Sequence, residues 1–306
     1  MNLLACITSF FVIVGFVIGN LANAFIVLVN SMDCVKRKKI SAADGILTGL
    51  AISRIGLLWV IVMEYCLIVL NTGTCRKQGT IIYHVSWVVT NHLSVWLATI
   101  LSIFYLLKIA NFSSLLFLHL KRRVKSIMVM ILLGMLMFLS VSFTMEYVEN
   151  VLDSYEGNVT WKSQLKDTIH LSNMTVFTLG SSIPFLISLI CVLLLIYSLC
   201  KHFRKMRLYS KGAQDPSTKV HVKALQTTTS FLLLFALYTF SVIISGWYYN
   251  KPLHESVNLL YQAAGSIYLS SHSCILIWAN KKLKQAFLSV VSQVRCWLKE
   301  WKISSP

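Results

Sequence analysis

One arginine stands near the middle of an apolar stretch, in the segment Leu50–Trp59 that reads LAISRIGLLW. Because a helix rises ~1.5 Å per residue, Arg54 would lie roughly 15 Å from either end of a membrane-spanning helix. A charge at that depth costs at least about 2.5–3.5 kcal/mol, and such residues normally face the interior of a helical bundle. The interface is too distant for the side chain to snorkel to it. The arginine therefore predicts a buried polar centre between helices.

Polar and aromatic residues also recur towards one end of several apolar segments. Trp87, Asn91 and Ser94 are spaced by four and three residues, which places them on one face of a helix. With residues at similar depth in other segments they would line an outward-facing amphipathic cavity for small organic ligands. The predicted ligand-binding residues are Trp87, Asn91, Glu64, Tyr65, Thr90, Ser94, Tyr238, Tyr261 and Gln262. The alternative is that Trp87 belongs to an interfacial aromatic belt, Asn91 joins helices, and Tyr238 only packs.

Catalytic and metal-binding patterns are missing from the apolar segments. There is no HExxH motif, no histidine pair at helical spacing and no pair of carboxylates on one helix. His92 and His272 stand alone in different segments, which favours a structural role for each. Lys281 lies at the end of the last segment, so a retinal Schiff base inside it is excluded. The eight cysteines show no metal-binding spacing. We therefore expect no enzyme, no cofactor and no metal.

The composition requires a membrane around these segments. Hydrophobic residues make up 56% of the 306 residues and charged residues 13%, and a bilayer-spanning helix needs ~20 mainly apolar residues. The windows predict an all-α integral membrane protein, a seven-transmembrane helix bundle with a short amphipathic C-terminal helix. The expected helices are 3–30, 44–71, 82–108, 126–148, 176–200, 226–249 and 258–280. Residues 1–306 then form a single domain with a tail at 281–306.

The basic residues predict the orientation of this bundle. Most of the 28 lysines and arginines fall in the connections after the first, third, fifth and seventh helices, including KRKK at 36–39 and KRRVK at 121–125. By the positive-inside rule the C-terminus is cytoplasmic and the N-terminus extracellular, in a multi-pass protein of the cell membrane. The net charge of +17 then indicates contact with anionic membrane lipids, overlapping a protein-partner surface, rather than with nucleic acid.

Two surface features follow from that orientation. The glycosylation motif Asn-x-Ser/Thr occurs at Asn111, Asn158 and Asn173. Because Asn111 falls on the inner side, only Asn158 and Asn173 are expected to be glycosylated. The tail intersperses basic residues with apolar ones, which is typical of a helix lying in the inner membrane interface; the apolar residues are Phe287, Val290, Val291, Val294, Trp297 and Trp301.

The motifs together closely resemble those of the type 2 (bitter) taste receptors, nearly from end to end. They include IGNLANAFIVLVN in the first helix, LAISR in the second and NHLSVWLATILSIFYLLKIANFS from the third helix onward. They continue with LHLKRRVKS, LLLIYSLCKHFRKM, DPSTKVHVKALQ and HSCILIWANKKLKQAFL. The chain also shares the family's FYxxK and HSxxL motifs, here Phe104–Lys108 and His272–Leu276, where rhodopsin-like receptors carry DRY and NPxxY.

The resemblance implies a G-protein-coupled receptor that binds small bitter organic molecules and activates a heterotrimeric G protein of the gustducin (Gi) type. It implies that Trp87 and Asn91 face the ligand and that Gln262 takes the pocket position of the seventh helix. Some relatives carry an acid where this chain has Gln262. We add the hypothesis that Glu64 supplies the negative charge instead and favours cationic ligands. Tyr238 is our candidate for the link between the pocket and the core.

The resemblance also implies a set of structural and activation residues: Asn20, Asn23, Arg54, Tyr105, Lys108, His272 and Ser273. In this family the arginine occupies the helix-two position that holds an aspartate in rhodopsin-like receptors. We expect Arg54 to bond to Asn20 or Asn23 and to serines such as Ser266 or Ser270. Arg54 is then a conformational hub and not a ligand contact.

Two alternatives stay open on the sequence alone. One is a different chemosensory receptor, such as a pheromone receptor of a related seven-helix family, which ligand screening would separate. The other is a small-molecule transporter or a scaffold, which would show flux or binding without G-protein activation. The interiors of the apolar segments hold only Glu64 and Glu146 as acids, which is fewer than an ion path needs, and an odd number of helices gives no sign of paired repeats.

Overall fold

The computed structural model describes residues 3–35, 41–69, 77–110, 119, 122–154, 159–209, 216–248 and 254–304. Within these ranges the chain forms eight helices and no strand. Their bounds are α1 Leu3–Val35, α2 Ala42–Val69, α3 Lys77–Ile109, α5 Val124–Ser154, α6 Val159–Tyr209, α7 Pro216–Trp247, α8 His254–Ala279 and α9 Lys281–Ser304. The predicted all-α bundle is confirmed.

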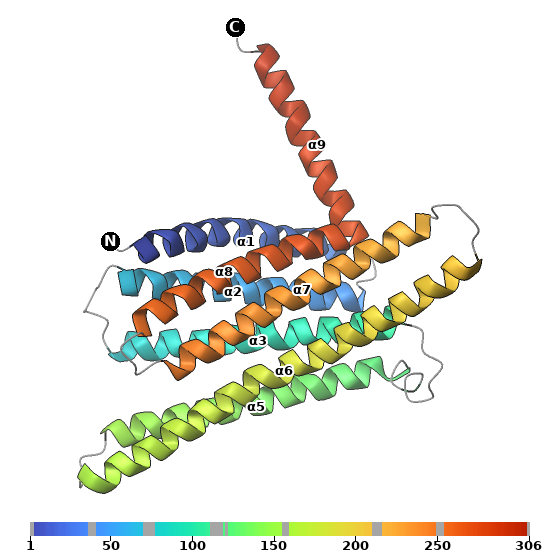
Figure 1. Ribbon diagram of the computed structural model, residues 1–306. Coiled ribbons are helices and arrows are strands. Elements are labelled where there is room, and N and C mark those ends of the chain that lie inside the picture. The colour runs from blue at the N-terminus through green and yellow to red at the C-terminus, as the bar shows by residue number, and fades with distance from the viewer. Residues whose placement is uncertain are drawn as a thin grey trace.

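The helices α1 to α8 run side by side as a bundle, while α9 turns away from it and projects sideways (Figure 1). The last helix of the bundle, α8, packs against α1, α2 and α7. On the other side, α3 contacts α2, α5 and α6. Because α2, α3, α7 and α8 adjoin in this way, side chains from these four helices can meet inside the bundle.

Six of the described helices, α1, α2, α3, α5, α6 and α7, are long and apolar enough to cross a membrane. The helix α8 is not among them, although we expected an apolar span at 258–280. Its polar side chains are buried against the neighbouring helices, among them Asn258, Gln262, Ser266, Ser270, His272 and Ser273. A helix inside a bundle tolerates polar residues that lipid would not, because its neighbours can pair with them.

The helix α6 is much longer than the expected span at 176–200, because it begins at Val159 and continues to Tyr209. The described residues between the expected helices 126–148 and 176–200 are therefore helical. No glycine or proline interrupts residues 159–179, and hydroxyl groups bond back to the helix, as Thr168 Oγ1 does to the Gln164 carbonyl at 2.9 Å. Such bonds satisfy polar side chains within their own helix.

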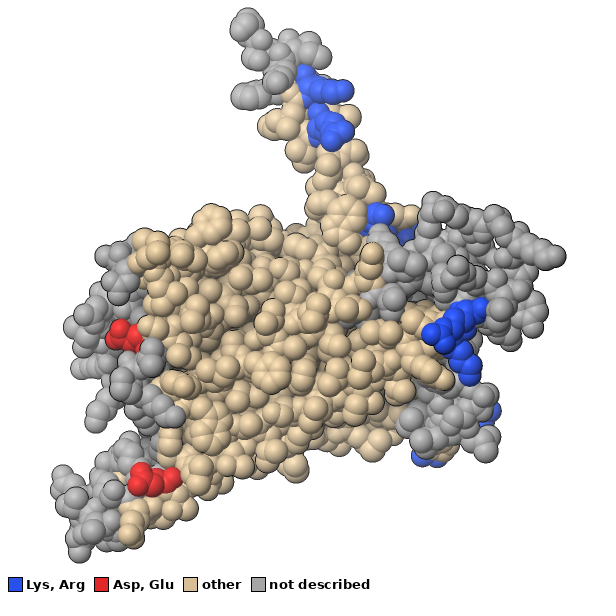
Figure 2. Space-filling model, in the orientation of Figure 1, with Lys and Arg blue, Asp and Glu red and all other residues tan. Residues whose placement is uncertain are grey.

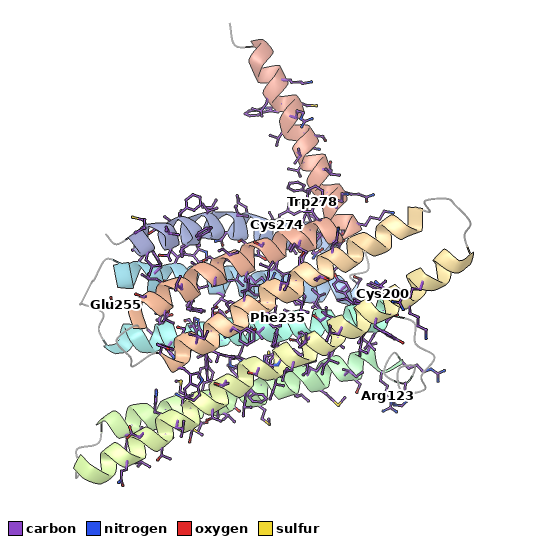
Figure 3. All side chains as sticks on the ribbon, in the orientation of Figure 1. Arg123, Cys200, Phe235, Glu255, Cys274 and Trp278 are labelled. Carbon is purple, nitrogen blue, oxygen red and sulfur yellow. The ribbon has the colours of Figure 1, made fainter. Side chains whose placement is uncertain are left out.

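The surface of the bundle is divided by charge. Figure 2 shows visible lysines and arginines at one end of the bundle and along α9, visible acids at the opposite end, and uncharged residues between them. We call the first the basic end; Arg123 and Cys200 lie there in Figure 3, and Glu255 lies at the opposite end. Exposed apolar side chains cover the middle, including Leu133, Met137, Leu193 and Leu237, as a surface that faces lipid requires.

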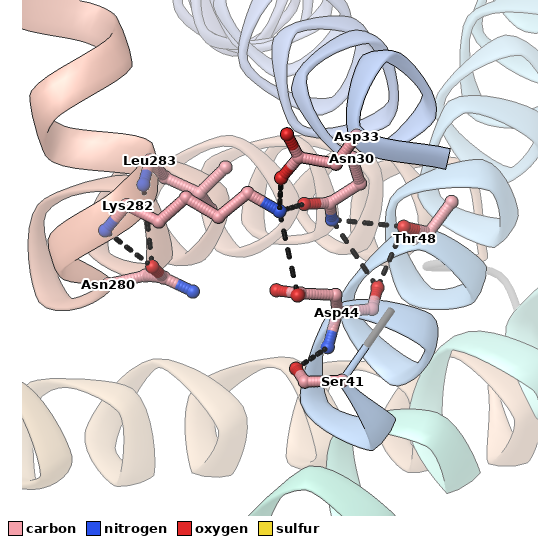
Figure 4. Close-up of polar contacts among 8 residues, drawn as sticks. All are labelled: Asn30, Asp33, Ser41, Asp44, Thr48, Asn280, Lys282 and Leu283. Atoms are coloured by element: carbon pink, nitrogen blue, oxygen red, sulfur yellow. Dashed lines mark hydrogen bonds and ion pairs between the residues drawn. The ribbon is translucent and has the colours of Figure 1, made fainter. Parts of the chain in front are cut away.

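At the basic end, Lys282 joins the first turn of α9 to two other helices (Figure 4). Its Nζ lies 2.7 Å from Asp33 Oδ2 in α1 and 3.5 Å from Asp44 Oδ2 in α2. The same nitrogen donates to Asn30 Oδ1 at 2.8 Å. Our sequence analysis missed this cluster, because nothing in the spacing of these four residues brings them together. They meet only because α1, α2 and α9 all have an end at this place.

Candidate functional site

Four aromatic residues from four helices form a cluster inside the bundle; we call Trp87, Phe177, Tyr238 and Tyr261 the aromatic cluster. The Trp87 ring stacks on Phe177 with centroids 5.8 Å apart, and the Trp87 Nε1 donates to the Tyr261 hydroxyl at 2.6 Å. The Tyr238 and Tyr261 rings lie 6.4 Å apart. The helices α3, α7 and α8 thus bring Trp87, Tyr238 and Tyr261 together.

Asn91 adds a polar group to the aromatic cluster, one helical turn after Trp87. Its side chain is 4% exposed, and its Oδ1 accepts a hydrogen bond of 2.6 Å from the Tyr238 hydroxyl. An asparagine in an apolar environment is stable only with such a partner. The contact means that Asn91 does join two helices, as the alternative interpretation held, and also that it lies beside the aromatic rings.

Several buried polar atoms around the aromatic cluster have no hydrogen-bond partner within the described residues. They are Gln262 Oε1 and Nε2, Glu64 Oε2 and Ser94 Oγ, and the Gln262 and Ser94 side chains are fully buried. Each unpaired buried polar group costs about 1–3 kcal/mol, so native proteins normally supply a partner from protein, water or ligand. These groups therefore indicate where a polar ligand atom or an ordered water would bind.

The Glu64 carboxylate lies at the junction of α2, α7 and α8. Its Oε1 accepts a hydrogen bond of 2.7 Å from Asn258 Nδ2. The Ser245 hydroxyl donates to Asn258 Oδ1 at 3.4 Å, so the Asn258 amide is bonded on both sides. Glu64 also lies near enough to the Tyr261 hydroxyl to act on it electrostatically. Sequence reasoning found Glu64 but missed Asn258 and Ser245.

Two residues of the predicted ligand-binding set lie elsewhere. Tyr65 faces α1, where its hydroxyl contacts the Ser9 hydroxyl and donates to the Ala5 carbonyl at 3.1 Å. Thr90 bonds back to the Ser86 carbonyl at 2.7 Å, and its methyl group lies against Gly56 of α2. Successive residues of a helix point about 100° apart, so Tyr65 points away from the direction of Glu64, and Thr90 from that of Asn91.

Phe177 is a member of the aromatic cluster that sequence reasoning missed. It lies in α6, in the part of the chain that we predicted as the start of a span, and it lacks a polar atom that would have drawn attention. The residue in the sequence that reflects this contact is Gly246 of α7, because a Cβ at that position would lie 2.8 Å from the Phe177 ring. Only glycine lets α7 approach the ring so closely.

A second polar centre surrounds Arg54, which is fully buried. Its Nη1 donates to Ser273 Oγ at 3.0 Å, and its Nη2 donates to the Tyr268 hydroxyl at 3.4 Å and contacts His272 Nδ1. The guanidinium carbon lies 5.4 Å from the centre of the Tyr268 ring. Hydroxyl groups, an imidazole and an aromatic face thus surround the charge, so the predicted buried polar centre is present.

The partners of Arg54 differ in part from those that we expected. Asn23 does belong to the centre, because its Oδ1 accepts from Ser273 Oγ at 2.8 Å. Asn20 instead donates to the carbonyl of Phe16 in its own helix, and Ser270 donates to that of Ser266. The expectation was off by about one turn of α8, because the register of two packed helices is not visible in either sequence segment.

The residues expected at the partner-binding end are half-buried or exposed. Tyr105 is half-buried beside Phe104, with ring centroids 6.3 Å apart. Lys108 is exposed, and its Nζ lies 5.5 Å from the Phe104 ring. Of the expected glycosylation sites, Asn158 lies outside the described residues, and Asn173 is half-buried within α6. No group of metal-ligating side chains occurs in the described part of the chain.

Comparisons with known proteins show the family of this chain. The family profile of the taste receptor protein (TAS2R) matches residues 1–295. The chain is 53% identical over 308 residues to taste receptor type 2 member 20 of Homo sapiens, with all of both chains covered. It is 55% identical over 303 residues to taste receptor type 2 member 31 of Pan troglodytes, covering 98% of each chain. The chain therefore belongs to the TAS2R taste receptor family, a family of multi-pass membrane receptors and not of enzymes.

Proposed function

We propose that this protein is a bitter taste receptor that binds small organic molecules at the aromatic cluster. One observation carries the proposal: aromatic rings and unpaired buried polar atoms lie together there, in a chain that belongs to a taste receptor family. Ligand sites combine apolar surface with a few convergent polar groups in this way. The proposed ligand contacts are Glu64, Trp87, Asn91, Ser94, Tyr238, Tyr261 and Gln262, with Phe177 added and Tyr65 and Thr90 left out.

The proposed orientation places the basic end in the cytoplasm and the N-terminus outside the cell. Its support is the distribution of the 28 lysines and arginines and the position of the visible basic residues in Figure 2. The ligand site then opens to the outside. The end of α5 and the start of α6 lie outside in this orientation, so Asn158 and Asn173 are proposed glycosylation sites.

The proposed partner at the basic end is a heterotrimeric G protein of the gustducin (Gi) type. Tyr105, Lys108 and the basic ends of the helices would contact it. A ligand that binds the outward-facing site more tightly in one conformation shifts the population towards that conformation. We propose that this conformation opens the inner ends of α6 and α7 to the G protein.

Membrane lipids are the proposed partner of α9. Its apolar side chains are exposed in the structure, including Phe287, Val291, Val294 and Trp297. It carries Lys284, Arg295 and Lys299 on the same helix. A helix of this composition that leaves a bundle sideways at its basic end suits the interface of an anionic leaflet.

A calcium assay tests the proposed function. Cells would express the chain with a promiscuous gustducin-like G protein and receive a broad panel of bitter compounds. The proposal predicts a response that Trp87→Ala and Asn91→Ala weaken at unchanged surface expression, while Val129→Ala, on the exposed surface of α5, leaves it intact. Responses that need no G protein, or ligand flux across the membrane, would favour the transporter or scaffold instead.

A further inference from the structure

We propose that Glu64 forms a cation-binding subsite of the ligand site and selects protonated amines that carry at least one N–H group. This inference rests on the proposed function, because it names the class of ligand that the receptor site takes. Three observations support it: an unpaired carboxylate oxygen, a buried amide beside it and the aromatic rings next to both.

The first observation is that only one oxygen of Glu64 is paired. Asn258 Nδ2 donates to Oε1 at 2.7 Å, while Oε2 is buried and has no hydrogen-bond partner within the described residues. Ser245 donates to Asn258 Oδ1 at 3.4 Å. The NH2 group of Asn258 is therefore directed at Glu64. The carboxylate is thus held in place by α7 and α8 with one strong acceptor still free.

The second observation is the fully buried Gln262, neither of whose amide atoms has a partner within the described residues. Asn258, Gln262 and Gly265 lie at positions i, i+4 and i+7, on one face of α8. Asn258 bonds to Glu64, and a Cβ at Gly265 would lie 3.2 Å from Ile61 Cδ1. Gln262 therefore lies in the same seam between α8 and α2, where its carbonyl oxygen adds a second free acceptor.

The third observation is that aromatic rings border the same part of α8. A Cβ at Gly265 would lie 3.4 Å from Tyr238 Cε2 as well as 3.2 Å from Ile61 Cδ1, and the Trp87 ring packs edge-to-face with Tyr261 at 6.4 Å. Aromatic rings attract organic cations through their negative faces, most strongly where water is excluded. A carboxylate, a second acceptor and aromatic rings together fit an ammonium group with an apolar substituent.

The free acceptors determine whether an anionic, a neutral or a cationic ligand fits the site. An anionic ligand would place like charges together, and a neutral ligand without a donor would leave Glu64 Oε2 unpaired. A quaternary ammonium ion satisfies the charge but has no N–H to give the oxygen. A protonated amine satisfies both the charge and the hydrogen bond.

Matched ligands test the inference. Amine agonists from the calcium assay would be compared with their N-acetyl analogues, which are neutral, on the wild-type chain and on Glu64→Gln. The variant keeps the acceptor for Asn258 and removes the charge. The proposal predicts a loss of amine potency of about 10- to 100-fold in Glu64→Gln, since hydrogen bonds to charged groups are strong, and little change for neutral agonists. Glu255→Gln, an exposed acid at the same end (Figure 3), should change neither.

The outcomes separate this inference from the proposed function. Responses to neutral or anionic compounds alone, or amine potency unchanged in Glu64→Gln at equal surface expression, would overturn the cation-binding subsite and leave the receptor intact. Loss of all agonist responses in Glu64→Gln at equal surface expression would contradict charge selection as well, because neutral agonists do not need the charge. A wild-type chain that reaches the surface and activates no G protein with any compound would overturn the proposed function itself.

Discussion

The rings of Tyr238 and Tyr268 stack with their centroids 4.7 Å apart and their planes 14° from parallel. Both rings are 1% exposed. The Tyr238 hydroxyl donates to Asn91, and the Tyr268 hydroxyl accepts from Arg54. One stacked pair therefore joins the aromatic cluster to the buried Arg54 centre, without any residue between them.

Two variants of Tyr238 separate the hydrogen bond from the stack. Tyr238→Phe keeps the ring but removes the bond to Asn91, so we expect agonist potency to fall by about 5- to 20-fold with the maximal response retained. Tyr238→Leu also removes the stack on Tyr268, so we expect a lower maximal response. Dose–response curves normalised to surface expression measure both. Equal maximal responses for the two variants would exclude a role of the stack in signalling.

Arg54 should not tolerate lysine. An ammonium group cannot reach Ser273 and Tyr268 with the two arms of a guanidinium, and each lost bond to a charged group costs about 1.5–3 kcal/mol. We expect Arg54→Lys to lower the thermal stability of the solubilised receptor and its surface expression. Arg122→Lys, at an exposed position, is the control. A stability equal to that of the control would mean that the Arg54 contacts contribute little.

Two glycines should respond to alanine in opposite directions. A Cβ on Gly15 of α1 would lie 2.8 Å from Ser266 Cβ and 3.0 Å from the Ser266 carbonyl oxygen, whereas nothing lies within 4 Å of one on Gly45. We expect Gly15→Ala to destabilise the packing of α1 on α8. Gly45→Ala should be neutral or stabilising by up to about 1 kcal/mol, because alanine favours a helix. Thermal unfolding of both variants in detergent checks this; a stable Gly15→Ala would refute the close packing.

Lys282 should fix the first turn of α9. Lys282→Met removes the contacts to Asp33 and Asp44, and because these side chains are 17–32% exposed, we expect a loss of only about 0.5–1 kcal/mol. Hydrogen exchange of the first turn of α9 should nevertheless speed up. Lys284→Met, which removes a cation–π contact with Trp278 instead, is the matched control. Equal exchange in both variants would show that the ion pairs do not hold α9.

The sequence was sufficient for the bundle and for much of the site. Apolar windows long enough to span a bilayer are a strong signal, and the four- and three-residue spacing of Trp87, Asn91 and Ser94 identified the inward face of α3 correctly. Arg54 predicted a buried polar centre, because a charge at the middle of a membrane-spanning helix is costly unless it faces other helices. These features depend on single helices, whose period is known in advance.

What the sequence did not predict depends on how two helices pack. The choice of Ser273 rather than Ser270 beside Arg54 follows from the register of α8 against α2. The bond between Asn258 and Glu64 and the position of Phe177 against Gly246 depend on the same kind of register. The extension of α6 back to Val159 was missed because its polar residues were not expected in a helix, although residues 159–179 contain neither glycine nor proline.

Direct ligand binding tests the central claim most closely, namely that the aromatic cluster is the ligand site. The receptor would be purified into nanodiscs, and saturable binding of a labelled agonist from the calcium assay would be measured for the wild type and for Trp87→Ala. We predict that Trp87→Ala weakens binding at least about 10-fold, because it removes the Phe177 stack and the Tyr261 bond. Unchanged affinity in a folded Trp87→Ala receptor would contradict the account and place the ligand elsewhere.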